Sequence, residues 1–182
     1  MNILEAKLKY IKTAERQMTC RDIIAVLQFL MYFNVFESTF FDDNKYSQIN
    51  GNRKQVYERL ENLNDAIYKK VNVCDYDFFA EHFSRRYSRT RMGNDMFCDL
   101  NLCYKISTEV REAIFNVVNY HSYSDKLIYY YLEICYKYRN NLFHGDKEIE
   151  GIGQYYNEFC CINNFMSKLM NDLTKVGFQQ QF

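Results

Sequence analysis

The stretch that decides the fold is Ser124–Gly145, which reads SDKLIYYYLEICYKYRNNLFHG. Several of its large side chains recur every three or four residues, the spacing of one face of an α-helix: Leu127, Tyr131, Ile134, Tyr138 and Leu142. Ser124 is a suitable N-terminal cap, and Gly145 can end the helix in the left-handed conformation that glycine adopts without strain. The stretch therefore predicts an aromatic-rich helix with polar residues at its C-terminal end.

Helical spacing also runs through most of the remaining chain. It is found over residues 4–11, 19–41, 56–71, 76–87, 107–118 and 155–173. The 182 residues include no proline and only six glycines, so little interrupts long helices, and the sequence shows neither a strand pattern nor a repeat. We therefore expect one all-α domain over residues 1–182, an up-and-down bundle of five to seven helices. The pattern is weakest over residues 74–105, where we expect an insertion beside the bundle.

The helix predicted over residues 19–41 is apolar on almost every side. Thr19 is a suitable cap, and the apolar run Ile23–Phe36 is interrupted only by Gln28 and Asn34. This run is too short to span a bilayer. A helix that is apolar all round lies at the centre of a bundle or in a subunit interface, and the sequence leaves both places open.

Composition narrows the class of protein. The first residues include Glu5, Lys7 and Lys9, which do not fit a signal peptide, so we expect a soluble, cytoplasmic protein that does not bind a membrane. The seven cysteines contain no C-x-x-C pair and only three histidines accompany them. Free thiols in a reducing compartment fit this pattern better than disulfides or zinc, and we expect neither a metal nor a cofactor.

Total charge gives no argument for nucleic acid, because Lys and Arg together number 23 and so do Asp and Glu. The local distribution is more informative, since four arginines fall within a short segment that also holds one aromatic side chain: Arg85, Arg86, Tyr87, Arg89 and Arg91. Such a segment can follow a phosphate backbone and stack a base on its tyrosine. It fits a solvated surface loop equally well, and both interpretations stay open.

The candidate catalytic residues are Arg139, Asn140 and His144, at the end of the predicted helix 124–145. RNA carries its own nucleophile, the 2′-hydroxyl, so its cleavage requires only proton transfers and stabilisation of the charged phosphorane. Imidazole, with a pKa of about 6.5, suits both proton transfers, and the guanidinium fork of arginine suits the phosphate. These residue types are therefore sufficient for RNA cleavage without a metal.

Their spacing constrains how they would meet. Arg139 and His144 are about 140° apart around an ideal helix, whereas Asn140 and His144 share a face. The long arginine side chain, with unwinding near Gly145, could bring all three to one end. One imidazole cannot easily act on both sides of the phosphorus, but a twofold dimer would place two copies of His144 in one cleft. The same residues also fit an ordinary helix C-terminus, where cationic side chains interact favourably with the helix dipole and glycine is common.

The stretch Arg139–Gly145, RNNLFHG, resembles the signature of HEPN domains: an Arg, a polar residue, and a His after four to six positions. The resemblance is clearest over residues 107–173, with the motif at the end of the middle of three helices. Phe33 and Asn34 in an aromatic helix are similar to the N-terminal helices of some members.

The resemblance implies an all-α bundle that dimerises through the motif face and cleaves RNA without a metal, as many members do in toxin–antitoxin and antiphage systems. Arg139 and His144 would be catalytic and Asn140 accessory, with RNA and an antitoxin or other regulatory protein as partners. Other members are non-catalytic modules for dimerisation, nucleotide binding or adaptor functions. Members paired with a nucleotidyltransferase antitoxin often carry a tyrosine two positions after the His; this chain has Asp146 there. The resemblance therefore does not imply neutralisation by modification of that tyrosine.

Overall fold

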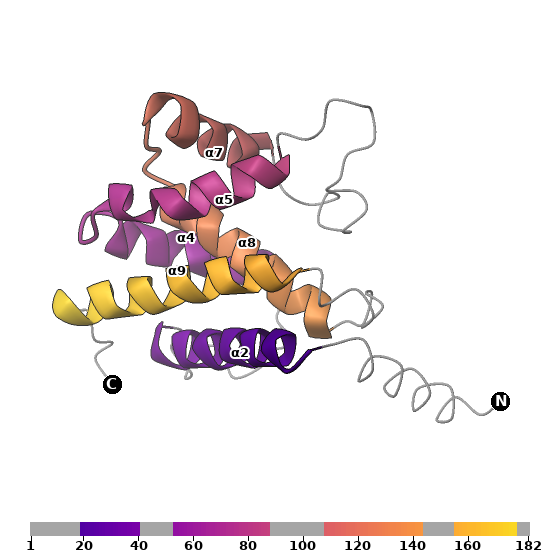
Figure 1. The fold of residues 1–182 in the computed structure, drawn as a ribbon. Helices are drawn as coiled ribbons and strands as arrows, with labels where there is room; N and C mark the ends of the chain where they lie inside the picture. Colours follow the sequence, from indigo (N-terminus) through magenta and orange to yellow (C-terminus); the bar gives the residue numbers. More distant parts are fainter. Residues whose placement is uncertain (1–18, 41–52, 88–107, 144–154, 178–182) are drawn as a thin grey trace.

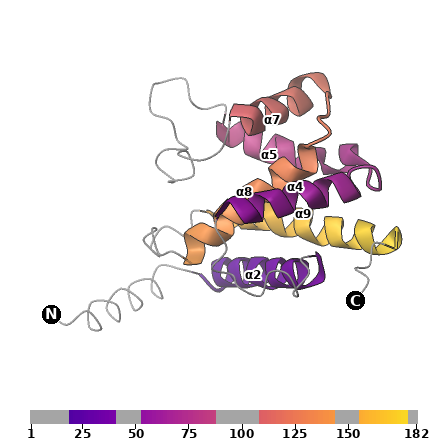
Figure 2. The ribbon, with the colours of Figure 1, turned by 180° about the vertical axis from the view of Figure 1, so that it is seen from behind.

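The computed structural model describes residues 19–40, 53–87, 108–143 and 155–177. These ranges form six α-helices and one short 3-10 helix, without a strand (Figures 1 and 2). The elements are α2 (Cys20–Phe40), α4 (Arg53–Ile67), η1 (Val73–Tyr76), α5 (Asp77–Tyr87), α7 (Thr108–Tyr120), α8 (Leu127–Phe143) and α9 (Tyr156–Lys175). The all-α prediction is confirmed for this part of the chain. None of these helices is both long and apolar enough to cross a lipid bilayer.

The central helix is α8. Every residue from 131 to 138 is buried, so neighbouring helices cover it on all sides. Aromatic side chains make many of these contacts: Tyr136 packs on Phe33 of α2, and Tyr131 packs on Phe79 of α5. Tyr138 also packs on Phe159 of α9. Such offset and edge-on ring pairs add to the stabilisation from area burial alone.

The predicted start of the helix over residues 19–41 agrees with the structure. The Thr19 hydroxyl accepts a hydrogen bond from the backbone N–H of Asp22 at 3.3 Å, and the Asp22 carboxylate accepts one from the Thr19 N–H at 2.9 Å. This reciprocal pair is a capping box, and it explains why α2 begins at Cys20. The helix predicted over residues 56–71 ends earlier, at Ile67, where a turn over residues 68–70 follows.

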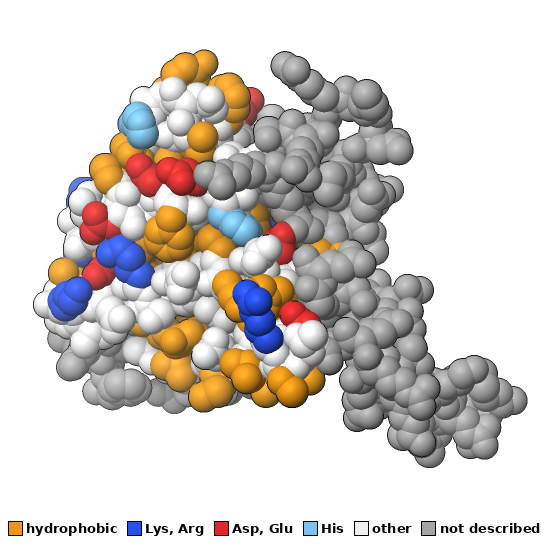
Figure 3. Space-filling view, viewed as in Figure 1, with side chains coloured by type: hydrophobic (Ala, Val, Ile, Leu, Met, Phe, Trp, Pro, Cys, Tyr) orange, Lys and Arg blue, Asp and Glu red, His pale blue; other side chains and the backbone are white. Residues whose placement is uncertain are grey.

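Helix α2 lies at the edge of the bundle, beside α9, and not at its centre (Figures 1 and 2). Its inner side chains are buried in the core: Ala25, Phe29, Phe33 and Phe36. Its outer side is also apolar but exposed, and hydrophobic side chains gather along the lower edge of the molecule in Figure 3, where α2 runs. An apolar sequence alone does not show which sides of a helix are covered, because that depends on the neighbours.

Part of the expected insertion, the segment 74–87, contributes side chains to the bundle core. Tyr76, Phe79, Ala80 and Phe83 are completely buried, and α5 packs against both α7 and α9. The rest of that expected insertion, residues 88–105, lies outside the described residues.

Asn64 on α4 forms hydrogen bonds to two backbone groups at the start of α8. This side chain is 1% exposed. Its Nδ2 donates to the carbonyl of Asp125 at 2.9 Å, and its Oδ1 accepts from the backbone N–H of Tyr129 at 3.0 Å. The Tyr129 N–H is one of the first-turn donors that a helix cannot satisfy itself. Asn64 therefore positions the helix that carries the candidate catalytic residues.

We predict that Asn64→Ala lowers the free energy of unfolding by about 2–3 kcal/mol, because it leaves two backbone groups without their partner. Asn62→Ala is the matched control, since Asn62 is exposed on the same helix and its loss should cost less than about 0.5 kcal/mol. Urea denaturation followed by circular dichroism measures both values. Equal losses in the two variants would contradict the role given to Asn64.

Candidate functional site

Arg139 lies where α8 leaves the bundle core. Tyr138, directly before it, is 4% exposed, whereas the Arg139 side chain is 21% exposed. Its Nη1 donates to Oδ1 of Asn140 at 3.2 Å, and its Nη2 lies 3.7 Å from Oε2 of Glu37 on α2. The guanidinium is therefore held between its sequence neighbour and a carboxylate from another helix, partly shielded from solvent.

Glu37 is a site residue that the sequence did not identify. Burial raises the pKa of its carboxyl, while the positive charges of Arg139 and of Arg59 on α4 act in the opposite direction. Glu37 on α2 thus interacts electrostatically with guanidinium groups from two other helices, and the three side chains form one charged group. With all three ionised, this group has a formal charge of +1, so an anion that approaches Arg139 competes with Glu37 rather than meeting a bare cation.

A second charged pair lies one helical turn earlier on α8. Lys137 Nζ and Glu133 Oε1 form an ion pair at i,i+4 spacing, and each side chain is only 7% exposed. Charges in such a place must be paired, because an isolated ion in the core loses its hydration without compensation. This pair allows α8 to remain buried on every side up to Tyr138.

The structure brings together two of the three predicted catalytic residues. Asn140 uses its Oδ1 acceptor for Arg139, so its Nδ2 group is not engaged in that contact. His144 follows Phe143, the last residue of α8, in the sequence and lies outside the described residues. Whether Asn140 orients the imidazole or donates to phosphate therefore stays a prediction.

The predicted basic segment begins in the last turn of α5. Arg85, Arg86 and Tyr87 form the last turn of α5, where the backbone is described and the side chains are not, and Arg89 and Arg91 lie outside the described residues. The ring of Phe83 on the same helix lies 6.1 Å from that of Tyr138. Helix α5 thus touches α8 through Phe83, one turn before its end, at Tyr138, the residue before Arg139.

No family model matches this chain, and no curated protein or solved structure matches it either. The resemblance to HEPN domains therefore rests on the residues from Arg139 to Gly145 and on the helical fold around them.

The other two histidines have structural positions. His121 has a φ of 48° and follows the end of α7. Its N–H bonds to the carbonyl of Val117, four residues earlier, which is the bond of an αL helix end, and the N–H of Ser122 bonds to the carbonyl of Asn116. His121 thus takes the left-handed position where glycine is more usual. His82 is half-buried on α5, with its ring edge-on to Phe83.

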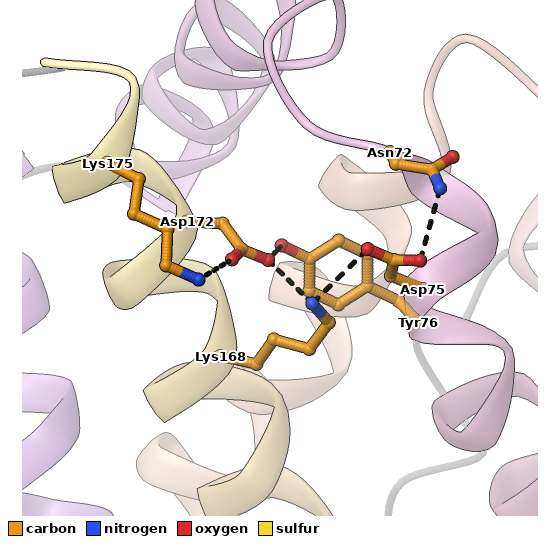
Figure 4. Close-up of polar contacts among 6 residues, drawn as sticks. All are labelled: Asn72, Asp75, Tyr76, Lys168, Asp172 and Lys175. Carbon is orange, nitrogen blue, oxygen red and sulfur yellow. Dashed lines mark hydrogen bonds and ion pairs between the residues drawn. The ribbon is translucent and has the colours of Figure 1, made fainter.

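A polar network joins η1 to α9 on another part of the molecule (Figure 4). The buried Tyr76 hydroxyl donates to Oδ2 of Asp172 at 3.0 Å, and Lys168 Nζ donates to the same oxygen at 2.7 Å. Lys168 also lies 5.1 Å from the centre of the Tyr76 ring, and Lys175 reaches the second oxygen of Asp172. Each partner balances another charge or donor, so we assign this network to packing of α9.

Metal-ligating residues do not gather within the described ranges. No group of three or more His, Cys, Asp or Glu side chains there is arranged to hold a metal ion. The described cysteines are free thiols: Cys20, Cys74, Cys135, Cys160 and Cys161. Burial raises the pKa of Cys161 to about 12 and also raises that of Cys135, which keeps both thiols protonated and unreactive.

We predict that Glu133→Gln lowers the free energy of unfolding by about 3–5 kcal/mol, because it removes the negative charge that pairs with the buried Lys137 ammonium. The double variant Glu133→Leu, Lys137→Met should recover most of this loss, since neither charge of the pair then stays in the core. Denaturant unfolding of the single and double variants measures the difference. A double variant as unstable as the single would contradict this account of the pair.

We also predict a pH dependence that arises at Asp172. Burial opposes ionisation of this carboxyl, but hydrogen bonds from Lys168, Tyr76 and Lys175 outweigh it and lower the pKa. A lowered pKa in the folded state gives stability at neutral pH that is lost as pH falls below about 4. Asp172→Asn should be less stable than the wild type at pH 7. Its free energy of unfolding should also fall less than that of the wild type between about pH 4 and pH 2.

Glu112→Gln provides the control for that measurement, because Glu112 is exposed on α7. Its curve of unfolding free energy against pH should follow the wild type. If the free energy of unfolding of Asp172→Asn falls with pH as much as that of the wild type, the Asp172 carboxyl does not contribute to the acid-induced loss of stability.

Proposed function

We propose that this chain is a HEPN-like, metal-independent endoribonuclease with an up-and-down helical fold. The observation that carries the proposal is the position of Arg139, which lies next to Asn140 where the buried helix α8 reaches the surface. His144 follows five residues later in the sequence. A rigid, packed helix is a suitable support for a catalytic cation, because little free energy is then lost in ordering it on the substrate.

The proposed reaction uses the 2′-hydroxyl of RNA as nucleophile. The imidazole of His144 removes the proton from that hydroxyl, O2′ bonds to phosphorus, and the bond from phosphorus to O5′ breaks. A protonated imidazole gives the departing oxygen its proton. The products are a 2′,3′-cyclic phosphate and a 5′-hydroxyl. Arg139 stabilises the phosphorane, where negative charge increases during the reaction.

A homodimer through the motif face would supply the second imidazole. The basic segment of Arg85, Arg86, Tyr87, Arg89 and Arg91 would bind the RNA strand next to the site. This placement is supported by the ring contact between Phe83 of α5 and Tyr138, the residue before Arg139. By resemblance, the protein acts in a toxin–antitoxin or antiphage setting, and an antitoxin or other regulatory protein restrains it.

A second candidate is a non-catalytic HEPN-like module for dimerisation, nucleotide binding or an adaptor function. The contact between Arg139 and Glu37 favours it, because an arginine paired with a carboxylate across two helices can serve packing alone. If the chain is such a module, Arg139→Ala changes stability or assembly, and there is no catalytic rate for it to change.

We predict that the purified protein cuts total cellular RNA in the presence of EDTA, and that His144→Ala and Arg139→Ala each lose at least about 100-fold in rate. His121→Ala and Arg21→Ala are matched controls. His121 is exposed at the end of α7, and Arg21 is exposed at the start of α2, where it stacks on Tyr156. Both controls should cut like the wild type.

Gel analysis of the RNA and light scattering of each variant separate the two candidates. A folded wild type that never cuts RNA, with an altered mass for Arg139→Ala, would favour the binding module. Cutting that EDTA abolishes would contradict the metal-independent mechanism.

A further inference from the structure

The outer side of α2 is an exposed apolar surface. Four of its side chains follow one another at intervals of three or four residues and are 52–68% exposed: Ile24, Leu27, Met31 and Val35. We refer to these four residues as the α2 stripe. Ile23, beside it, is 39% exposed. On an ideal helix the four residues lie within about 80° of one another, so they form one continuous surface.

The stripe carries no charge. No Asp, Glu, Lys or Arg occurs between Asp22 and Glu37, and the exposed polar residues near the stripe are the neutral Gln28, Asn34 and Ser38. Helices that lie on membranes usually combine such a stripe with Lys and Arg on the flanks, whereas α2 is flanked by Asp22 and Glu37. A neutral stripe can face a second copy of itself without like-charge repulsion, which a charged one cannot.

The area of the stripe is sufficient for self-association. At on the order of 100 Å² for each exposed aliphatic side chain, the stripe and Ile23 offer roughly 500 Å² per copy. Two copies would bury about 1,000 Å² of mostly apolar surface, the size at which specific protein interfaces begin. Monomers seldom expose a single apolar patch much larger than this without using it for binding.

We propose that the α2 stripe is a contact between two copies of this chain, with the two α2 helices antiparallel around a twofold axis near Leu27 and Met31. Antiparallel packing brings the positive end of each helix dipole toward the negative end of the other. Glu37 lies about 120° around α2 from Met31, on the side that faces Arg139. The four stripe residues therefore leave Glu37 outside the contact, on the flank of α2, and the contact is distinct from a dimer through the motif face.

The experiment is light scattering on the purified full chain at micromolar concentration. We expect the mass of Met31→Lys to be half that of the wild type, because an ammonium group at the centre of the contact would lose its hydration without a partner. Met31 is 68% exposed, so the substitution should not disturb folding, and far-ultraviolet circular dichroism checks this. Leu27→Lys should halve the mass in the same way if Met31→Lys cannot be purified.

Two control variants test the position of the contact. Met31→Leu should keep the wild-type mass because it stays apolar. Phe115→Lys should also keep it, since Phe115 is similarly exposed, at 53%, but lies on α7. If the wild type and Met31→Lys are both monomers, the stripe does not join two copies and the proposal is overturned. Equal masses above that of a monomer would place the assembly on a different surface and overturn it too.

Discussion

The burial of α8 on every side is the constraint on which the rest of the structure depends. A helix with eight successive buried residues, 131–138, needs neighbours all round, and α2, α4, α5 and α9 supply them. It also needs its internal charges to be paired, which Glu133 and Lys137 achieve within the helix itself. The position of the candidate site follows, because Arg139 and Asn140 are the first side chains of α8 after this buried segment to be partly exposed.

The helices were predictable because local chemistry determines them. The spacing of large apolar residues located α8 and α9, and the capping pair of Thr19 and Asp22 lies within four consecutive residues. The arrangement was less predictable, because it depends on which faces meet. The irregular pattern around residues 74–87 concealed a buried aromatic segment, and the apolar character of α2 gave no sign that only one side of it faces α9.

In the candidate site too, local contacts were predictable from the sequence and contacts between helices were not. Arg139 and Asn140 are adjacent in the sequence, so their contact required only the helix. The spacing of Glu133 and Lys137 was also readable from the sequence as an i,i+4 pair, although their burial was not. Glu37 could not be found in this way, because its approach to Arg139 depends on how α2 packs against the bundle. A carboxylate beside the candidate catalytic arginine matters for function, since a substrate phosphate must compete with it.

The measurement that tests the central claim most directly is the chemistry of the RNA ends. If His144 and Arg139 direct attack by the 2′-hydroxyl, RNA cut in EDTA carries 5′-hydroxyl ends that a kinase labels without prior phosphatase treatment, and 2′,3′-cyclic phosphates on the other side of the cut. Ends that require phosphatase treatment before labelling carry a 5′-phosphate. That result would show that water and not the 2′-hydroxyl is the nucleophile, and it would contradict the proposed role of Arg139 and His144.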